Sequence, residues 1–166
     1  MKAHALSVLA LLGLTPMVAA RSQAGHDHAA MHAGGDSAYQ AMKARGRAAM
    51  GVDQERSTHR FTSLSDGGRI ELTSDGEDSG ATAAIRRHFA DIEKAFAAGD
   101  FSIPAMVHAQ DVPGADVMRA KASVITYRLH EVPRGAQLHI ITRDKTALAA
   151  VHRFLRFQRT EHHAGQ

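Results

Sequence analysis

The feature that most constrains this chain is a pattern of two paired strands followed by a helix, which occurs twice. Residues 57–64 (STHRFTSL) and 69–74 (RIELTS) alternate polar and apolar side chains and flank the turn residues SDGG. Residues 123–131 (SVITYRLHE) and 136–142 (AQLHIIT) alternate in the same way about a PRG turn. Alternation with a period of two is typical of strands with one buried face, so the pattern predicts two antiparallel hairpins.

The turns and the alternation together predict which side chains of the hairpins are buried. Asp66-Gly67 indicates a type I′ turn, which needs positive φ at both central positions. The buried face is expected to carry His59, Phe61, Ile70 and Leu72 in the first hairpin, and Ile125, Tyr127, Leu129, Leu138 and Ile140 in the second. On the outer face of the second hairpin, His130 and His139 are expected to lie opposite each other.

Apolar residues at helical spacing follow each hairpin. Residues 81–98 carry such a stripe, formed by Ile85, Phe89, Ile92 and Phe96, and Gly99 suits the end of that helix. Residues 145–163 carry a second stripe, formed by Leu148, Val151, Phe154 and Leu155. The segments AAIRRHF and AAVHRFL hold the same place in the two units. We therefore predict an internal ββα repeat joined by an irregular connection over 100–121. The expected fold is a two-layer α+β domain, a four-stranded antiparallel sheet with both helices on one face.

The first fifty residues differ in composition from this domain. Residues 1–20 have a Lys, an apolar run and small residues before Ala20, which is typical of a secretory signal peptide cleaved there. Residues 21–50 read as a flexible His-rich arm followed by a short helix over 37–50, and 51–166 as the α+β domain. The predicted location is the periplasm or the outside of the cell, with no stable membrane insertion.

Composition excludes several kinds of chemistry. The chain has no cysteine, so disulfides, thiolate ligands and thiol nucleophiles are ruled out. A net charge of +3 with scattered basic residues does not indicate a nucleic-acid partner. No phosphate-binding loop, nucleophile elbow or metalloprotease motif is present, so we expect that the protein is not an enzyme.

Histidine is the residue type that stands out, with 12 in the chain. His59 belongs to the buried face of the first hairpin, and His88 and His152 flank the apolar stripes of the two helices. Each of these histidines, taken alone, is also explained as a core residue that makes its own hydrogen bonds. Together they are expected to converge, since a two-layer fold brings the inner sheet face and both helices together. The candidate metal ligands are His59, His88, His108, His152, His162 and His163.

The adjacent His162 and His163 would point about 100° apart on a regular helix, so they do not suit one ion together. The arm residues His26, His28 and His32, with Met31, form a second, weaker ligand set. Mixed His and Met without Cys suits copper better than structural zinc. The methionines Met42, Met50, Met106 and Met118 add soft ligands, although methionine more often fills a core.

Several segments carry a resemblance to a known group of proteins. MGVDQ, STHRF, GDFSIPAMVH and FQRTEHH resemble a family of small, exported, largely uncharacterised bacterial proteins over about residues 44–163. Similar chains have a second His where Arg60 stands here. Relatives sometimes carry the name aspartate carbamoyltransferase, a label that the length of this chain and its lack of a phosphate loop do not support. The resemblance implies a site built from His59, His88, His108, His152 and His162.

The sequence thus predicts a periplasmic copper-binding protein that sequesters or delivers the ion and binds it less well below pH about 6, where imidazole is protonated. Two alternatives remain. One is an interaction module of an exported complex, with a periplasmic protein partner and purely structural histidines. The other is a protein that binds haem non-covalently through two histidines.

Overall fold

The computed structural model describes the backbone of residues 26–164 and the side chains of residues 37–164. Its helices and strands follow one another in the order expected of two ββα units preceded by a helix. In chain order they are α1 (His26–Met50), the 3₁₀ helix η1 (Gln54–Arg56), β1 (Ser57–Leu64), β2 (Gly67–Ser74), α2 (Ser79–Ala97), α3 (Ser102–His108), α4 (Ala115–Ala120), the 3₁₀ helix η2 (Ala122–Val124), β3 (Ile125–Val132), β4 (Gly135–Thr142) and α5 (Lys145–Glu161).

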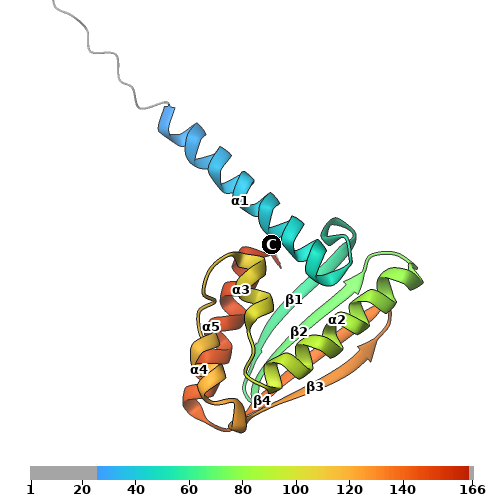
Figure 1. Cartoon of the computed structure of the whole chain (residues 1–166), viewed down its shortest axis with the longest axis vertical. Helices are drawn as coiled ribbons and strands as arrows, with labels where there is room; N and C mark the ends of the chain where they lie inside the picture. Colours follow the sequence, from blue (N-terminus) through green and yellow to red (C-terminus); the bar gives the residue numbers. More distant parts are fainter. Residues whose placement is uncertain (1–25, 165–166) are drawn as a thin grey trace, which may run out of the picture.

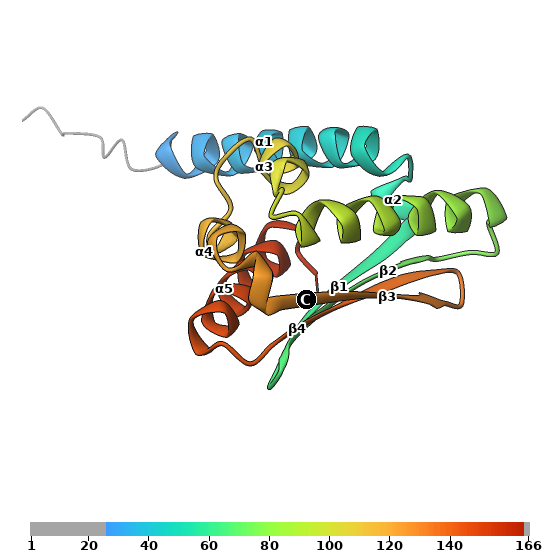
Figure 2. The same cartoon turned by 60° about the horizontal axis from the view of Figure 1, so that its bottom comes forward.

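The four strands form one antiparallel sheet in the order β1-β2-β4-β3. In the first hairpin His59 pairs with Leu72 and Phe61 with Ile70, so the predicted inner face is correct. Both long helices, α2 and α5, cover this face (Figures 1 and 2). The predicted two-layer α+β fold is therefore confirmed.

Each long helix packs over the hairpin of the other unit. Helix α2 follows β1 and β2 in the chain but contacts mainly β3 and β4, whereas α5 contacts mainly β1 and β2. The buried stripe of α2 contains the four predicted residues, Ile85, Phe89, Ile92 and Phe96. In α5 the stripe is centred on Val151, Phe154 and Leu155, while the predicted Leu148 is partly exposed. This crossing joins the two units into a single core.

The repeat extends to the polar residues that hold the helices. An aspartate precedes each long helix, and Asp78 accepts a hydrogen bond from Ala81 N–H as Asp144 does from Ala147 N–H. About two helical turns after each aspartate, a side chain of the helix donates to backbone carbonyl groups at the turn end of the other unit's hairpin. His152 Nε2 lies 2.9 Å from Leu64 O and 3.0 Å from Gly67 O. In the other unit Arg86 makes the equivalent contacts, since its guanidinium group donates to Gly135 O and to Val132 O, each at 3.3 Å.

Two turns differ from the expectation. The first hairpin turns at Ser65 and Asp66, without the type I′ conformation, because neither residue has positive φ. Gly67 instead begins β2 with φ of 147°, where its backbone lies against Ile140. The second hairpin pairs His139 with Arg128, so His130 and His139 share the outer face but are not opposite each other.

Two segments are more helical than expected. The connection after α2 forms α3 and α4, and Asp100 supports the start of α3 by accepting from Ser102 N–H at 2.8 Å. Helix α1 begins at His26 rather than near residue 37 and packs against α3 (Figure 2). No helix among residues 26–164 is long and apolar enough to cross a bilayer. The predicted signal peptide, residues 1–20, lies outside the described residues.

The close approach at Gly67 gives a test of the sheet. A Cβ at this position would lie 1.9 Å from Ile140 O, and its φ of 147° disfavours other residues. We expect Gly67→Ala to lower the free energy of unfolding by about 2 kcal/mol or more, measured by urea denaturation. Gly76→Ala is the matched control, since nothing lies within 4 Å of its added methyl group. Equal stability of the two variants would contradict the packing described for β2 and β4.

Candidate functional site

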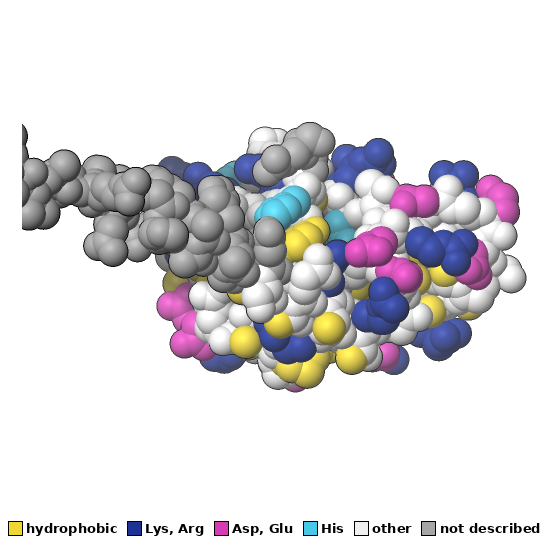
Figure 3. Space-filling model, turned by 90° about the horizontal axis from the view of Figure 1, so that it is seen from above, with side chains coloured by type: hydrophobic (Ala, Val, Ile, Leu, Met, Phe, Trp, Pro, Cys, Tyr) yellow, Lys and Arg dark blue, Asp and Glu magenta, His cyan; other side chains and the backbone are white. Residues whose placement is uncertain are grey.

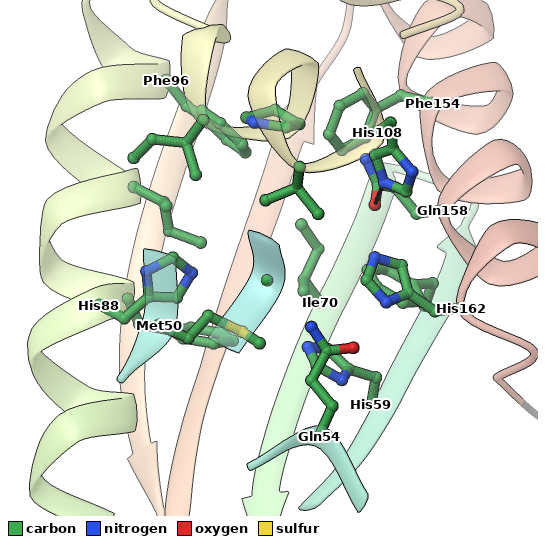
Figure 4. Close-up of a pocket in the computed structure, with 17 residues that line it drawn as sticks. Met50, Gln54, His59, Ile70, His88, Phe96, His108, Phe154, Gln158 and His162 are labelled. Atoms are coloured by element: carbon green, nitrogen blue, oxygen red, sulfur yellow. Dashed lines mark hydrogen bonds between the residues drawn. The ribbon is translucent and has the colours of Figure 1, made fainter. Parts of the chain in front are cut away.

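A pocket of about 70 Å³, partly open to solvent, lies between the sheet and the long helices and is lined by histidines from four separate segments of the chain. His59 comes from the inner face of β1, His88 from α2, and His108 is the last residue of α3. His162 follows the end of α5. We call this space the inner cavity; Figure 4 shows the four rings around it.

Three of these rings are in contact. The centroids of His59 and His162 lie 5.0 Å apart with 29° between the planes. The centroids of His108 and His162 lie 5.1 Å apart with perpendicular planes. Phe61 contacts both His59, at 5.7 Å, and His162, at 5.5 Å. The fold thus gathers residues separated by a hundred positions in the chain into one imidazole cluster.

His108 has a defined tautomer. Its Nε2 lies 2.9 Å from Gln158 Oε1, and an amide oxygen only accepts, so Nε2 carries the proton. The other nitrogen, Nδ1, is buried, holds a free lone pair and has no hydrogen-bond partner. A buried nitrogen without a partner is costly, and such a group usually binds a water molecule, an ion or another ligand. A ring held through one N–H while the other nitrogen stays free is the usual arrangement of a metal-binding histidine.

Burial keeps the cluster neutral. It is the main cause that lowers the pKa of His59 to about 4, with a further contribution from nearby His88. The pKa of His162 is lowered to about 3 by burial first and then by the neighbouring imidazoles. Burial also lowers the pKa of His88 and of His108. Neutral imidazole is the form that binds metal ions, so at neutral pH the four rings are available as ligands.

The opposite wall of the inner cavity is less polar and includes the thioether group of a methionine. His88 and Met50 lie together across the cavity from His108 and His162 (Figure 4). Met50 comes from the end of α1 and is buried. None of the residues that line the cavity is Asp or Glu. An ion here would therefore meet nitrogen and sulfur ligands, while the carboxylates of Glu161 and Asp91 act on His108 and His88 from outside the lining.

His163 points away from the inner cavity. Helix α5 ends at Glu161, and the backbone of His163 is left-handed, with φ of 50°. Its ring stacks on Tyr39 of α1 with a centroid distance of 4.3 Å and an angle of 4° between the planes. His162 and His163 therefore face different surroundings, as predicted. The cause is the left-handed backbone of His163 and not the angle between neighbouring residues of a regular helix.

His152 is not part of the cluster, and its predicted convergence with His59 and His88 is wrong. Its bonds to Leu64 O and Gly67 O hold it at the turn end of the first hairpin, whereas His162 lies beyond the end of α5. The segments AAIRRHF and AAVHRFL align His152 with Arg86, not with His88. The counterpart of His88 is Phe154, which also lines the inner cavity.

The remaining candidate ligands are spread through the molecule. Met42 and Met118 are buried elsewhere, and Met106 is exposed. The arm residues His26, His28 and His32 lie in the part of α1 whose side chains are outside the described residues.

The cluster is not a finished metal site. Among the side chains that the structure describes, no group of three His, Asp or Glu residues is arranged to hold a metal ion. His59 and His162 contact each other through their ring faces, with 29° between the planes, and a stacked pair does not direct its nitrogens at one point between the rings. Imidazole ligands must place nitrogen about 2.0–2.1 Å from an ion. Binding therefore requires these two rings to turn toward His108 Nδ1.

Two residues of the site were not predicted. Gln158 lies one helical turn before His162 on the same side of α5, and a glutamine in the stripe after Phe154 was the signal available in the sequence. Gln54, from η1, lines the inner cavity and donates to Lys43 O in α1. No pattern in the sequence indicated its position.

Comparisons with protein-family models, curated proteins and solved structures gave no match. The resemblance drawn from the sequence motifs therefore stays a prediction, and the site has to be interpreted from its own geometry.

The lowered pKa values predict acid sensitivity of folding. Folded His59 and His162 resist protonation, whereas in the unfolded chain they take up protons near the ordinary value of 6.5. The free energy of unfolding should therefore be highest above pH 6.5 and fall below it toward pH 4, by about 1 kcal/mol per pH unit for each ring. Urea denaturation at pH 7.5, 6, 5 and 4 measures this slope. A His59→Gln/His162→Gln variant should show a smaller slope, and an unchanged one would contradict the neutral cluster.

The hydrogen bonds of His152 give an independent prediction. His152→Ala leaves Leu64 O and Gly67 O without their donor, so we expect a loss of about 1–3 kcal/mol in the free energy of unfolding. His130→Ala, at an exposed position on the outer sheet face, should change it little. If His152→Ala has the same free energy of unfolding as the wild type, the hydrogen bonds between α5 and the first hairpin are not stabilising.

Proposed function

We propose that the protein binds a copper ion in the inner cavity, between His59, His108 and His162, and serves in its sequestration or delivery. The observation that supports this most strongly is the buried, unpartnered Nδ1 of His108, oriented by Gln158 and adjacent to His162. The leader-like residues 1–20 support an exported, periplasmic location for this activity. Catalysis forms no part of the proposal.

The size of the inner cavity favours an ion over an organic cofactor. Pockets for drug-sized ligands usually measure about 300–1,000 Å³. The inner cavity measures about 70 Å³, which suits an ion with a few water molecules. Haem, the alternative cofactor considered from the sequence, would require α2 and α5 to separate. The observed packing therefore gives haem no support.

The ligand chemistry favours copper, and monovalent copper in particular. Thioether and imidazole ligands suit Cu(I), and Met50 and His88 lie across the cavity from the His108 cluster. No carboxylate lines the cavity to balance a second positive charge. The cost of burying charge rises steeply with its magnitude, so a monovalent ion is easier to accommodate than Zn²⁺ or Cu²⁺.

Binding requires only a local rearrangement. His162 stands one residue beyond the end of α5, so its ring can turn without moving the sheet. His59 is held by Phe61 and His162, and its ring is freed when His162 turns. Because the pKa values of both rings are lowered, protons compete with the ion only at a lower pH than for an ordinary imidazole.

The alternative is an adaptor in which the histidines serve structure. The stacking of His59 on His162 favours this reading, since stacked rings fill space as aromatic residues do. It predicts that copper neither binds tightly nor changes the stability of the folded protein. The same titration therefore separates the two functions.

Titration with Cu(I) against a chromogenic chelator tests the proposal. We expect one tightly bound ion per chain, and about a 10- to 100-fold weaker affinity for Gln158→Leu, which leaves His108 without its orienting partner. His162→Ala should weaken binding at least as much, because it removes a ligand at a partly exposed position. His130→Ala and His152→Ala should bind as the wild type does.

A spectroscopic signal adds a readout that does not depend on affinity. In protein labelled with ¹⁵N-histidine, binding should shift His108 Nδ1 while its Nε2 keeps the proton donated to Gln158. An absence of binding at micromolar Cu(I), or binding that survives His162→Ala and Gln158→Leu unchanged, would contradict the copper site.

A further inference from the structure

A second, polar hollow adjoins the inner cavity and is open to solvent to a similar degree. It measures about 210 Å³ and is lined by Tyr39, Gln54, Ser57, Thr58, His59, His162, His163 and Ala164. We call it the outer hollow. Three of its lining residues, Gln54, His59 and His162, also line the inner cavity. These side chains are therefore the wall between the two spaces.

The ring of His163 belongs to the outer hollow alone. His163 is exposed, whereas His162 beside it in the chain is partly buried and His108 behind that is buried. Histidine side chains reach the surface on the face of the molecule shown in Figure 3. From the surface inward, imidazoles thus follow one another in the order His163, His162, His108.

The backbone is built to give the two adjacent histidines these separate positions. The left-handed conformation of His163, with φ of 50°, turns the chain out of the helix direction. Such a conformation is uncommon for a residue other than glycine and persists where surrounding contacts hold it. Here the ring stacks on Tyr39 with an angle of 4° between the planes, and Ala164 packs against the core.

Imidazole ligands that lie one after another in space allow a metal ion to move between them by exchange of ligands. An ion held by His163 in the outer hollow is within reach of His59 and His162, which line both spaces. When His162 turns inward, as binding at His108 requires, it carries the ion away from His163. No redox step is needed, because each step replaces one imidazole nitrogen ligand with another.

We propose that the outer hollow is the entry site for the ion, at which His163 accepts it and passes it to His162. This inference rests on the proposed copper function and adds the route by which the ion reaches the inner cavity. His163 is then a ligand of the encounter complex and not of the final site. The distinction has a kinetic consequence, since an entry site changes the rates of uptake and release together and leaves the final affinity unchanged.

Stopped-flow uptake of Ag⁺, a redox-inert stand-in for Cu(I), tests the proposal on the full chain. His163→Phe keeps a ring to stack on Tyr39 but removes the nitrogen ligands, so it separates ligation from packing. We expect uptake and release both to slow by about tenfold, with an unchanged equilibrium affinity. His163→Met, which supplies a soft ligand again, should restore much of the rate.

The controls distinguish the entry site from the inner site. Tyr39→Ala removes the stack but leaves the imidazole, and His130→Ala removes an exposed histidine elsewhere; neither should slow uptake as much as His163→Phe. Uptake by His163→Phe at the wild-type rate would overturn the entry site while leaving the inner site intact. A lower affinity with unchanged uptake would overturn it as well, since His163 would then belong to the final site. Failure of the wild type to take up Ag⁺ or Cu(I) would instead overturn the copper function itself.

Discussion

The structure depends on a reciprocal tie between its two ββα units. At the turn end of each hairpin, two backbone carbonyl groups accept hydrogen bonds from one side chain on the helix of the other unit, His152 in one case and Arg86 in the other. A part-buried carbonyl without a donor is costly, so these bonds fix where each helix crosses the sheet. The crossing sets α2 and α5 apart on the same face and leaves the inner cavity between them (Figure 4).

The candidate site arises where the repeat departs from its own symmetry. His59 is the third residue of β1, and the third residue of β3 is Tyr127. The counterpart of His88 is Phe154. The two units therefore place an imidazole and an aromatic ring at equivalent positions, and Tyr127 and Phe154 both contact Phe96. Helices α1 and α3, which lie outside the repeat, supply Met50 and His108 to the inner cavity.

Much of the fold followed from local patterns, and the site followed only in part. Alternation and helical spacing are local signals, so the hairpins, the sheet faces and the stripe of α2 were predictable. Reasoning from a two-layer fold predicted that His59 and His88 lie close together, and both line the inner cavity, whereas it did not place His108 or His162. The same reasoning failed for His152, because helical spacing gives the face of a helix but not the distance along it at which a partner lies. Gln158 and Gln54 matter through contacts with distant segments, which no local pattern encodes.

By itself, the sequence determined the kinds of ligand this protein can offer, since a chain without cysteine and rich in histidine has only imidazole, thioether and oxygen groups. It also determined the order of strands and helices, because periodicity is a property of neighbouring residues. Only the tertiary structure decided which imidazoles meet, which are neutral and which nitrogen is free. Burial and the crossing of the two units set these properties, and both arise from contacts between residues that are far apart in the chain.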